Sequence, residues 1–296
     1  MTVADATETR NRTYAGILLT SIAYMLFTFQ DAAIKLLVDS IAVWQVLFFR
    51  SVTILAGAVA IGGIGLVRDS LDSPVFGQMF LRSFLILVAW LCYYTAARDL
   101  QLAELTTIYF AAPMIVTALS VAILGEKVPA FRWVAVVTGF VGVFIACNPA
   151  SLGFTLPVVL VLLAAAFWAL SIVLIRKIAL KERTLVQLVL NNGFFLVIAG
   201  VPMAFYWTTP DLGQLALLLG VGVIGGIAQF GLFEGMKRAP ASAVASFEYT
   251  SLVWSFLVGW LIWSDVPRVE VFFGAALIVG AGVMIIAGEH FLRPER

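Results

Sequence analysis

The stretch Ala103-Glu-Leu-Thr-Thr-Ile-Tyr-Phe-Ala-Ala-Pro113, which runs on to Gly125-Glu126, returns later in the chain. Its second copy is Ser242-Ala-Val-Ala-Ser-Phe-Glu-Tyr-Thr-Ser-Leu252, which runs on to Ser264-Asp265. Each half of the chain has room for about five membrane helices. Because an odd number of helices per repeat turns the second copy over, the halves are expected to face opposite sides of a bilayer. We therefore predict two inverted five-helix repeats, at 14–148 and 153–290, around a central cavity.

The composition is that of a membrane protein. Hydrophobic residues make up 62% of the 296 residues and charged residues 12%, and the mean hydropathy is +1.05. Ordinary soluble domains are roughly 45–50% apolar and about 25% charged. The apolar runs are continuous, whereas barrel strands alternate apolar and polar residues. The sequence therefore predicts an all-α membrane protein with ten transmembrane helices.

The ten expected helices are separated by turn-forming or charged residues. Their ranges are Tyr14–Leu37, Ala42–Val67, Phe76–Ala97, Ala103–Leu124, Ala130–Cys147, Pro157–Lys177, Thr184–Tyr206, Asp211–Met236, Ala241–Trp263 and Val269–Glu289.

Lysine and arginine favour one orientation in the membrane. If the N-terminus is cytoplasmic, 14 of the 18 basic residues lie inside: Arg10, Arg12, Arg68, Arg82, Lys127, Arg132, Arg176, Lys177, Lys181, Arg183, Lys237, Arg238, Arg293 and Arg296. Cytoplasmic loops of membrane proteins carry an excess of such residues. We therefore predict a multi-pass protein of the cell inner membrane with both termini cytoplasmic.

Small residues predict close helix packing in the fifth and tenth helices. Ala135 and Gly139 form a small-xxx-small pair in the fifth helix, and Ala276 and Gly280 form one in the tenth. Small side chains let helix backbones approach closely. These two helices are expected to form a static spine, although small residues are also common in membrane helices at large.

Pro113 lies in the middle of the fourth helix, where it removes one backbone hydrogen bond and favours a kink. Its counterpart in the second copy is Leu252. A kink in one half alone would make two gates unequal, or it is a fixed bend with no role in motion.

Ionisable side chains at membrane depth are costly and usually meet a partner or a cavity. Asp31 and Lys35 are one helical turn apart and can pair. Arg50 lies at a similar depth, so an Asp31–Arg50 pair is also plausible, as is snorkelling of Arg50 towards the membrane surface. The functional alternatives are that Arg50 binds a solute carboxylate, or that Asp31 or Glu248 carries a coupling proton.

Aromatic and amide side chains at membrane depth are the candidates for a solute site. Aromatic rings suit an apolar or aromatic solute, and amides suit a small zwitterion because they offer donors and acceptors without charge. The alternative is ordinary helix packing. The predicted substrate-binding residues are Trp90, Tyr94, Tyr109, Trp168, Asn191, Gln229, Glu248 and Tyr249, with Asp31, Arg50, Pro113, Gly139 and Gly280 in structural or gating roles.

The sequence contains no pattern typical of an enzyme, a cofactor site or a metal site. It has no Walker loop, no HExxH and no Gly-x-Ser-x-Gly elbow. Cys92 and Cys147 fall inside apolar runs and are expected to be small buried thiols. A net charge of +1 without a basic patch gives no indication of nucleic-acid binding. The expected partners are a small solute and membrane lipid.

The doubled unit, with its segments from Pro113 to Gly125-Glu126 and up to Ser264-Asp265, resembles the drug/metabolite transporter superfamily, EamA type. The aromatic run Trp90-Leu-Cys-Tyr-Tyr94 and Glu248-Tyr249 are similar to YddG-type bacterial amino-acid exporters. The resemblance covers about residues 14–290. It implies a ten-helix bundle that works by alternating access and exports aromatic and other neutral amino acids. Ser264-Asp265 departs from the common Gly-Glu ending, which weakens any role for a carboxylate there.

Three functions remain open on the sequence. The first is an exporter of aromatic and other neutral amino acids. The second is an exporter with the same fold and another cargo, such as a drug, a sugar or a nucleotide precursor. The third is a membrane enzyme or scaffold, for which a buried catalytic cluster or a large soluble surface is expected, and the sequence shows neither.

Overall fold

The computed structural model describes residues 3–124, 130–147, 155–178, 182–238 and 250–292. Within these ranges all regular secondary structure is helical and no strand is present. The helices are α1 Val3–Val38, α2 Val43–Gly62, α3 Gly65–Leu71, α4 Phe76–Ala96, α5 Leu102–Tyr109, α6 Ala111–Leu124, α7 Ala130–Cys147, α8 Leu156–Ile178, α9 Thr184–Phe205, α10 Leu212–Arg238, α12 Thr250–Trp263 and α13 Val269–Leu292.

The helices confirm an all-helical, multi-pass membrane protein. Among the described residues, seven helical segments are long and apolar enough to cross a bilayer, with α5 and α6 counted together as one. Three shorter apolar helices lie within α7, α12 and α13. Leu, Ile, Val and Phe side chains on the outside of the bundle remain exposed, as lipid-facing surfaces require.

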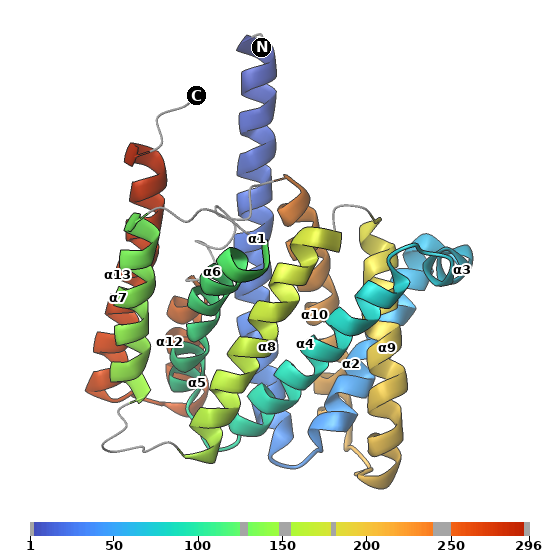
Figure 1. Ribbon diagram of the computed structural model, residues 1–296. Coiled ribbons are helices and arrows are strands. Elements are labelled where there is room, and N and C mark those ends of the chain that lie inside the picture. Colours follow the sequence, from blue (N-terminus) through green and yellow to red (C-terminus); the bar gives the residue numbers. More distant parts are fainter. Residues whose placement is uncertain (1–2, 125–129, 148–154, 179–181, 239–249, 293–296) are drawn as a thin grey trace.

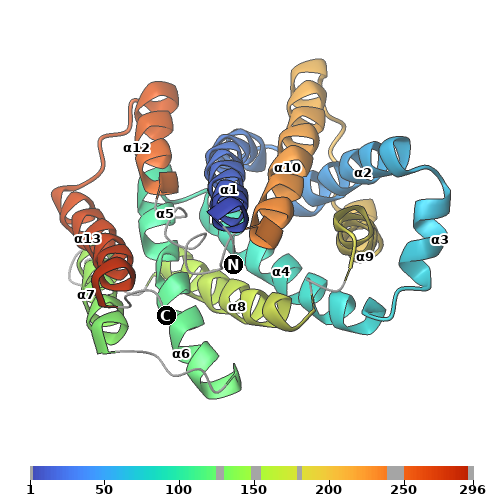
Figure 2. The same cartoon turned by 90° about the horizontal axis from the view of Figure 1, so that it is seen from above.

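The bundle is arranged around α1 (Figures 1 and 2). Seen from above, α10, α4, α8, α5 and α12 surround it. The pair α7 and α13 lies at one side, and α2, α9 and the short α3 lie at the other. α1 begins well before the apolar segment, so its polar first turns project beyond the other helices. The core therefore lies where α1 meets helices from both halves of the chain.

Two of the expected helices are divided. The second breaks at Gly63, whose φ of +76° lies in the left-handed region that favours glycine. The fourth breaks at Phe110, between α5 and α6. Pro113 cannot donate a hydrogen bond to the carbonyl of Tyr109, so a helix that starts afresh at Ala111 tolerates the proline in its first turn. The kink expected from Pro113 therefore takes the form of an interruption three residues earlier.

α7 and α13 pair as expected, and they approach closely at two glycines that the sequence analysis did not name. A Cβ atom on Gly274 would lie 2.5 Å from the carbonyl oxygen of Gly142, and one on Gly142 would lie 2.7 Å from that of Gly274. A Cβ atom on Gly139 would overlap the Met114 side chain and would also lie 3.6 Å from Ala281 Cβ of α13, whereas one on Gly280 would have no neighbouring atom within 4 Å. The prediction of Gly280 as a packing residue was wrong, because six residues turn a helix by about 240° from the face of Gly274.

We expect Gly274→Val to destabilise the protein by about 1–3 kcal/mol, because the new side chain would force the α7 and α13 backbones apart. Gly280→Val is the matched control, on the same helix with open space around it. Thermal unfolding in detergent measures both. Equal losses for the two variants would contradict the close contact between Gly142 and Gly274.

Candidate functional site

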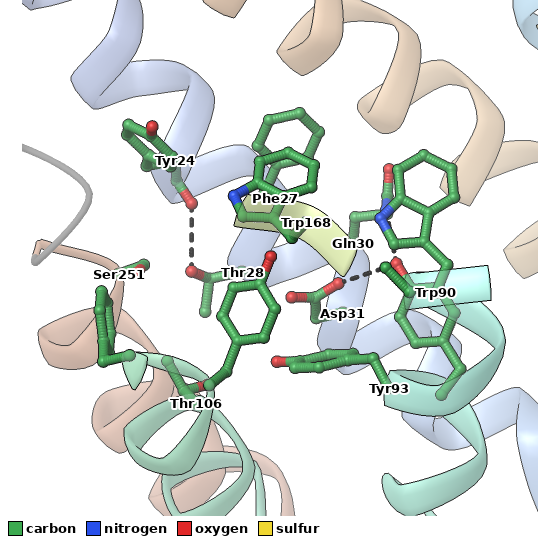
Figure 3. Close-up of a pocket in the computed structure, with 14 residues that line it drawn as sticks. Tyr24, Phe27, Thr28, Gln30, Asp31, Trp90, Tyr93, Thr106, Trp168 and Ser251 are labelled. Atoms are coloured by element: carbon green, nitrogen blue, oxygen red, sulfur yellow. Dashed lines mark hydrogen bonds between the residues drawn. The ribbon is translucent and has the colours of Figure 1, made fainter. Parts of the chain in front are cut away.

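A cavity of about 90 Å³ lies at the middle of the bundle, and its lining comes from both halves of the chain. This volume has room for several water molecules. The lining belongs to α1, α4, α5, α8 and α12 and to the break between α5 and α6 (Figure 3). It consists of Tyr24, Phe27, Thr28, Gln30, Asp31, Ala89, Trp90, Tyr93, Tyr94, Thr106, Tyr109, Phe110, Trp168 and Ser251.

The break in the fourth span lies against this cavity. Tyr109 is the last residue of α5 and Phe110 is the residue between the two helices. The amide of Phe110 still donates to the carbonyls of Thr106 and Thr107, at 3.1 and 3.3 Å. Interrupted helices occur at membrane depth where the protein or a cavity covers the backbone. Tyr109 and Phe110, the two residues at this break, both belong to the cavity wall.

A continuous series of aromatic rings forms much of the wall. Ring centroids are 6.5 Å apart for Trp168 and Tyr109, 5.2 Å for Tyr109 and Tyr93, 5.5 Å for Tyr93 and Tyr94, and 6.4 Å for Tyr94 and Trp90. The Tyr93 pairs meet edge to face, the arrangement that ring quadrupoles favour. The cavity therefore offers a largely apolar surface that also carries tyrosine hydroxyl groups.

Asp31 presents the charge of this cavity. Its carboxylate lies between the ring of Tyr93 and those of Phe27 and Trp168 in Figure 3. The Tyr94 hydroxyl donates to Asp31 Oδ1 at 3.1 Å and accepts from Gln30 Nε2 at 3.2 Å. The other lining residues in the described part of the chain are uncharged.

The two ion pairs that the sequence suggested for Asp31 are absent from the described residues. Lys35 Nζ instead donates to the carbonyls of Ala97 and Leu100, both at 2.6 Å. These carbonyls belong to the turn after α4, where the helix leaves backbone acceptors free. Arg50 also does not pair directly with Asp31, since Gln30 and Tyr94 lie between them.

Behind the cavity wall, Arg50 is fully buried and does not snorkel. Its Nε donates to Gln30 Oε1 at 3.2 Å and its Nη1 to Asn192 Oδ1 at 3.5 Å. The guanidinium lies 4.1 Å from the ring centroid of Trp90, within range of a cation–π interaction. Arg50 thus connects the cavity wall to α9 while its own charge stays outside the cavity.

A second buried arginine, Arg82, belongs to α4 and precedes the cavity-lining residues of that helix. Arg82 Nη1 and Ser83 Oγ both donate to Asn191 Oδ1, at 3.4 and 3.1 Å. On the other side of α9, Asn192 Nδ2 donates to Gln229 Oε1 at 3.3 Å. The amides at 191, 192 and 229 therefore hold α4, α9 and α10 together at membrane depth.

Gly225 on α10 allows α1 to approach this polar cluster. A Cβ atom at this position would overlap the Gln30 side-chain oxygen and lie 3.0 Å from Arg50 Nε. The absence of a side chain at 225 is thus a condition for the bond between Arg50 and Gln30.

At the end of the bundle away from the N-terminus, Arg268 Nε and Glu104 Oε1 form an ion pair at 2.9 Å. Glu104 is in the first turn of α5, and Arg268 directly precedes α13. Nearby, burial raises the pKa of Asp265 above its ordinary value, although the charge of Lys35 opposes this.

The structure separates the predicted site residues into three sets. Trp90, Tyr94, Tyr109 and Trp168 line the cavity. Asn191 and Gln229 belong to the buried polar cluster and do not line it. Glu248 and Tyr249 lie outside the described residues.

Of the α1 residues that line the cavity, the sequence analysis named Asp31 and missed the others. Tyr24, Phe27, Thr28 and Asp31 follow the i, i+3, i+4, i+7 spacing of one helix face, and this spacing could have identified them. In the described residues, no group of three or more His, Cys, Asp or Glu side chains is placed to hold a metal ion.

Comparison with known proteins gives a family match over both halves. The model of the EamA-like transporter family matches residues 14–147 and, a second time, residues 155–287. A crystal structure with no functional description has the same fold, with a TM-score of 0.69 and 16% identity, over 97% of this chain and 99% of that one.

Three relatives illustrate the range of solutes. A riboflavin transporter of Vibrio cholerae is 32% identical over 72% of each chain. An S-adenosylmethionine uptake transporter of Rickettsia bellii is 27% identical over 82% of this chain and 81% of its own. The pseudopaline exporter CntI of Pseudomonas aeruginosa is 27% identical over 92% of this chain and 95% of its own.

We expect Arg50→Met to destabilise the protein, because it leaves the buried acceptors of Gln30 and Asn192 without a donor, at about 1–3 kcal/mol for each. Arg68→Met is the control, since Arg68 is exposed on α3 and forms an ion pair with the exposed Asp72. Thermal unfolding in detergent is the measurement. Similar midpoints for the two variants would contradict a structural role for Arg50.

Proposed function

Because the chain belongs to the EamA-like transporter family, we propose that it exports aromatic and other neutral amino acids across the bacterial inner membrane by alternating access. The observation that carries this proposal is the aromatic cavity, lined by α1, α4 and α5 from the first half and α8 and α12 from the second. Solute sites of secondary transporters lie near the midplane, between the two repeats. Tyr24 to Asp31 lie near the middle of the membrane-crossing part of α1.

The chemistry of the wall favours an amino acid with an aromatic or apolar side chain. Trp168, Tyr109, Tyr93, Tyr94 and Trp90 offer ring faces and edges for such a side chain. Asp31 and the tyrosine hydroxyls offer polar contacts for its backbone groups. In this proposal, the buried cluster around Arg50 and Asn191 holds the helices and does not contact the solute.

A different cargo on the same fold is the second candidate. The relatives are named for riboflavin, S-adenosylmethionine and pseudopaline, and both uptake and export occur among them. Riboflavin also contains a planar ring system that an aromatic wall would suit. Transport measurements with amino acids and with riboflavin therefore have to be made side by side.

The two matches to the family model support an arrangement of two inverted five-helix repeats. The proposed motion is a rocking of helices around the cavity. In it, α7 and α13 form the static spine, since the Gly142–Gly274 contact leaves no room for a shift between their backbones.

Basic residues support a cytoplasmic N-terminus. α3, the start of α9 and the end of α10 lie at the same end of the bundle as the N-terminus (Figure 1). Arg68, Arg183, Lys237 and Arg238 belong to these segments. The excess of positive charge at this end is typical of a cytoplasmic face.

Liposomes containing the purified protein and loaded with labelled phenylalanine or tryptophan are expected to show saturable efflux. Tyr109→Ala should raise the KM for phenylalanine by about tenfold, because loss of one aromatic contact costs roughly 0.5–1.5 kcal/mol beyond the area that it buries. Trp260→Ala, at an exposed position of α12, is the control and should leave KM unchanged. Saturable efflux of riboflavin but of neither amino acid would favour the second candidate.

Fusion proteins test the orientation. A fluorescent protein that matures only in the cytoplasm should fluoresce when it is joined to Arg296, and a phosphatase that folds only in the periplasm should be inactive there. The reverse pattern would place the basic end of the bundle outside the cytoplasm.

A further inference from the structure

We infer that the cavity binds the cationic ammonium group of its solute at Asp31, inside the ring of aromatic side chains, and that no carboxylate on the solute is needed for binding. This inference rests on the proposed transport function and names the chemical group that the cavity selects.

The first observation is the charge of the lining. Asp31 contributes a carboxylate, and no lysine, arginine or histidine lines the cavity among the described residues. The nearest buried cation, Arg50, donates to Gln30 and Asn192 and lies over the ring of Trp90. Arg50 therefore reaches Asp31 only through the side chains of Gln30 and Tyr94.

The second observation is the hydrogen bonding of the carboxylate. An ionised carboxylate accepts about four hydrogen bonds. The Tyr94 hydroxyl supplies one, and the Tyr93 hydroxyl interacts with the same group. Asp31 is only partly buried, and its remaining surface faces the cavity. The carboxylate thus retains acceptor capacity for an N–H donor, and a donor with positive charge gives the strongest such bond.

The third observation is the composition of the wall around this carboxylate. The rings of Phe27, Tyr93, Tyr109 and Trp168 belong to the same lining as Asp31. An organic cation is attracted to the faces of such rings, and a cage of them is a common means of binding ammonium groups. A negatively charged solute would meet both the Asp31 charge and the negative ring faces. The lining therefore favours cations and zwitterions over anions.

Three solutes with the same phenyl ring separate these possibilities. Phenethylamine is a cation, phenylalanine is a zwitterion and 3-phenylpropionate is an anion at neutral pH. Isothermal titration calorimetry of the protein in nanodiscs should give the tightest binding for phenethylamine, comparable or weaker binding for phenylalanine, and binding at least about tenfold weaker for 3-phenylpropionate.

Asp31→Asn should weaken the binding of phenethylamine by at least about tenfold. The affinity for 3-phenylpropionate should stay within about twofold of the wild-type value. Asp31→Glu keeps a carboxylate and should keep the preference for the cation. This result would show that the loss of binding in Asp31→Asn is due to the missing charge and not to misfolding. Asp39→Asn, at an exposed acid just beyond α1, is the matched control and should bind like the wild type. Equal affinities for the three solutes, or an unchanged preference in Asp31→Asn, would overturn the inference.

The same proteins in liposomes keep the two proposals apart. Saturable phenylalanine efflux without any charge preference in binding would uphold the transport function and reject the role of Asp31. Asp31-dependent binding of phenethylamine, without efflux of any of the three solutes, would support the role of Asp31 and reject the transport function.

Discussion

The structure depends on one constraint: inside a bilayer no water is available to satisfy backbone N–H and C=O groups. Each apolar segment must therefore be a helix, and a helix can be interrupted only where protein or a cavity covers the exposed backbone. The break at Phe110 obeys this rule, since Phe110 is buried and lies against the central cavity. Tyr109 and Phe110, which lie at this break, both belong to the cavity wall, so the helix interruption and the central cavity are parts of one feature.

Buried polar side chains meet the same requirement in part, since Arg50 Nη2, Arg82 Nε and Asn191 Nδ2 have no hydrogen-bond partner among the described residues. Arg50, Arg82, Asn191, Asn192 and Gln229 are each less than a tenth exposed. Their hydrogen bonds run between α2, α4, α9 and α10 and reach α1 through Gln30. Burying a guanidinium in a low-dielectric interior is costly unless it is hydrogen-bonded. The cluster therefore fixes how these helices meet, and it also holds the Trp90 side of the cavity wall.

Much of the fold could be predicted from the sequence, because the length of an apolar segment is almost sufficient to predict a membrane helix. The bounds of α4, α7 and α9 were predicted to within one residue, and the transporter family was recognised from the repeated segments. Tertiary partners were harder to predict. Whether Asp31 meets Lys35, Arg50 or Tyr94 depends on helix rotation, which residue spacing along the chain does not give. For the same reason Gly280 was mistaken for the packing glycine, although Gly274 makes that contact. The aromatic residues of α4, α5 and α8 were named as candidates for the cavity, whereas on the facing side of α1 only Asp31 was named.

The missing side chain at Gly225 has a consequence for how related proteins could diverge in solute preference. The Gln30 side chain occupies the space that any larger residue at 225 would need, and Gln30 holds the Tyr94 hydroxyl that donates to Asp31. Replacement of this glycine would displace the amide and reorient the tyrosine, and through it the carboxylate. If the cavity holds the solute as proposed, a single substitution on α10 would alter it, although none of the described lining residues belongs to that helix.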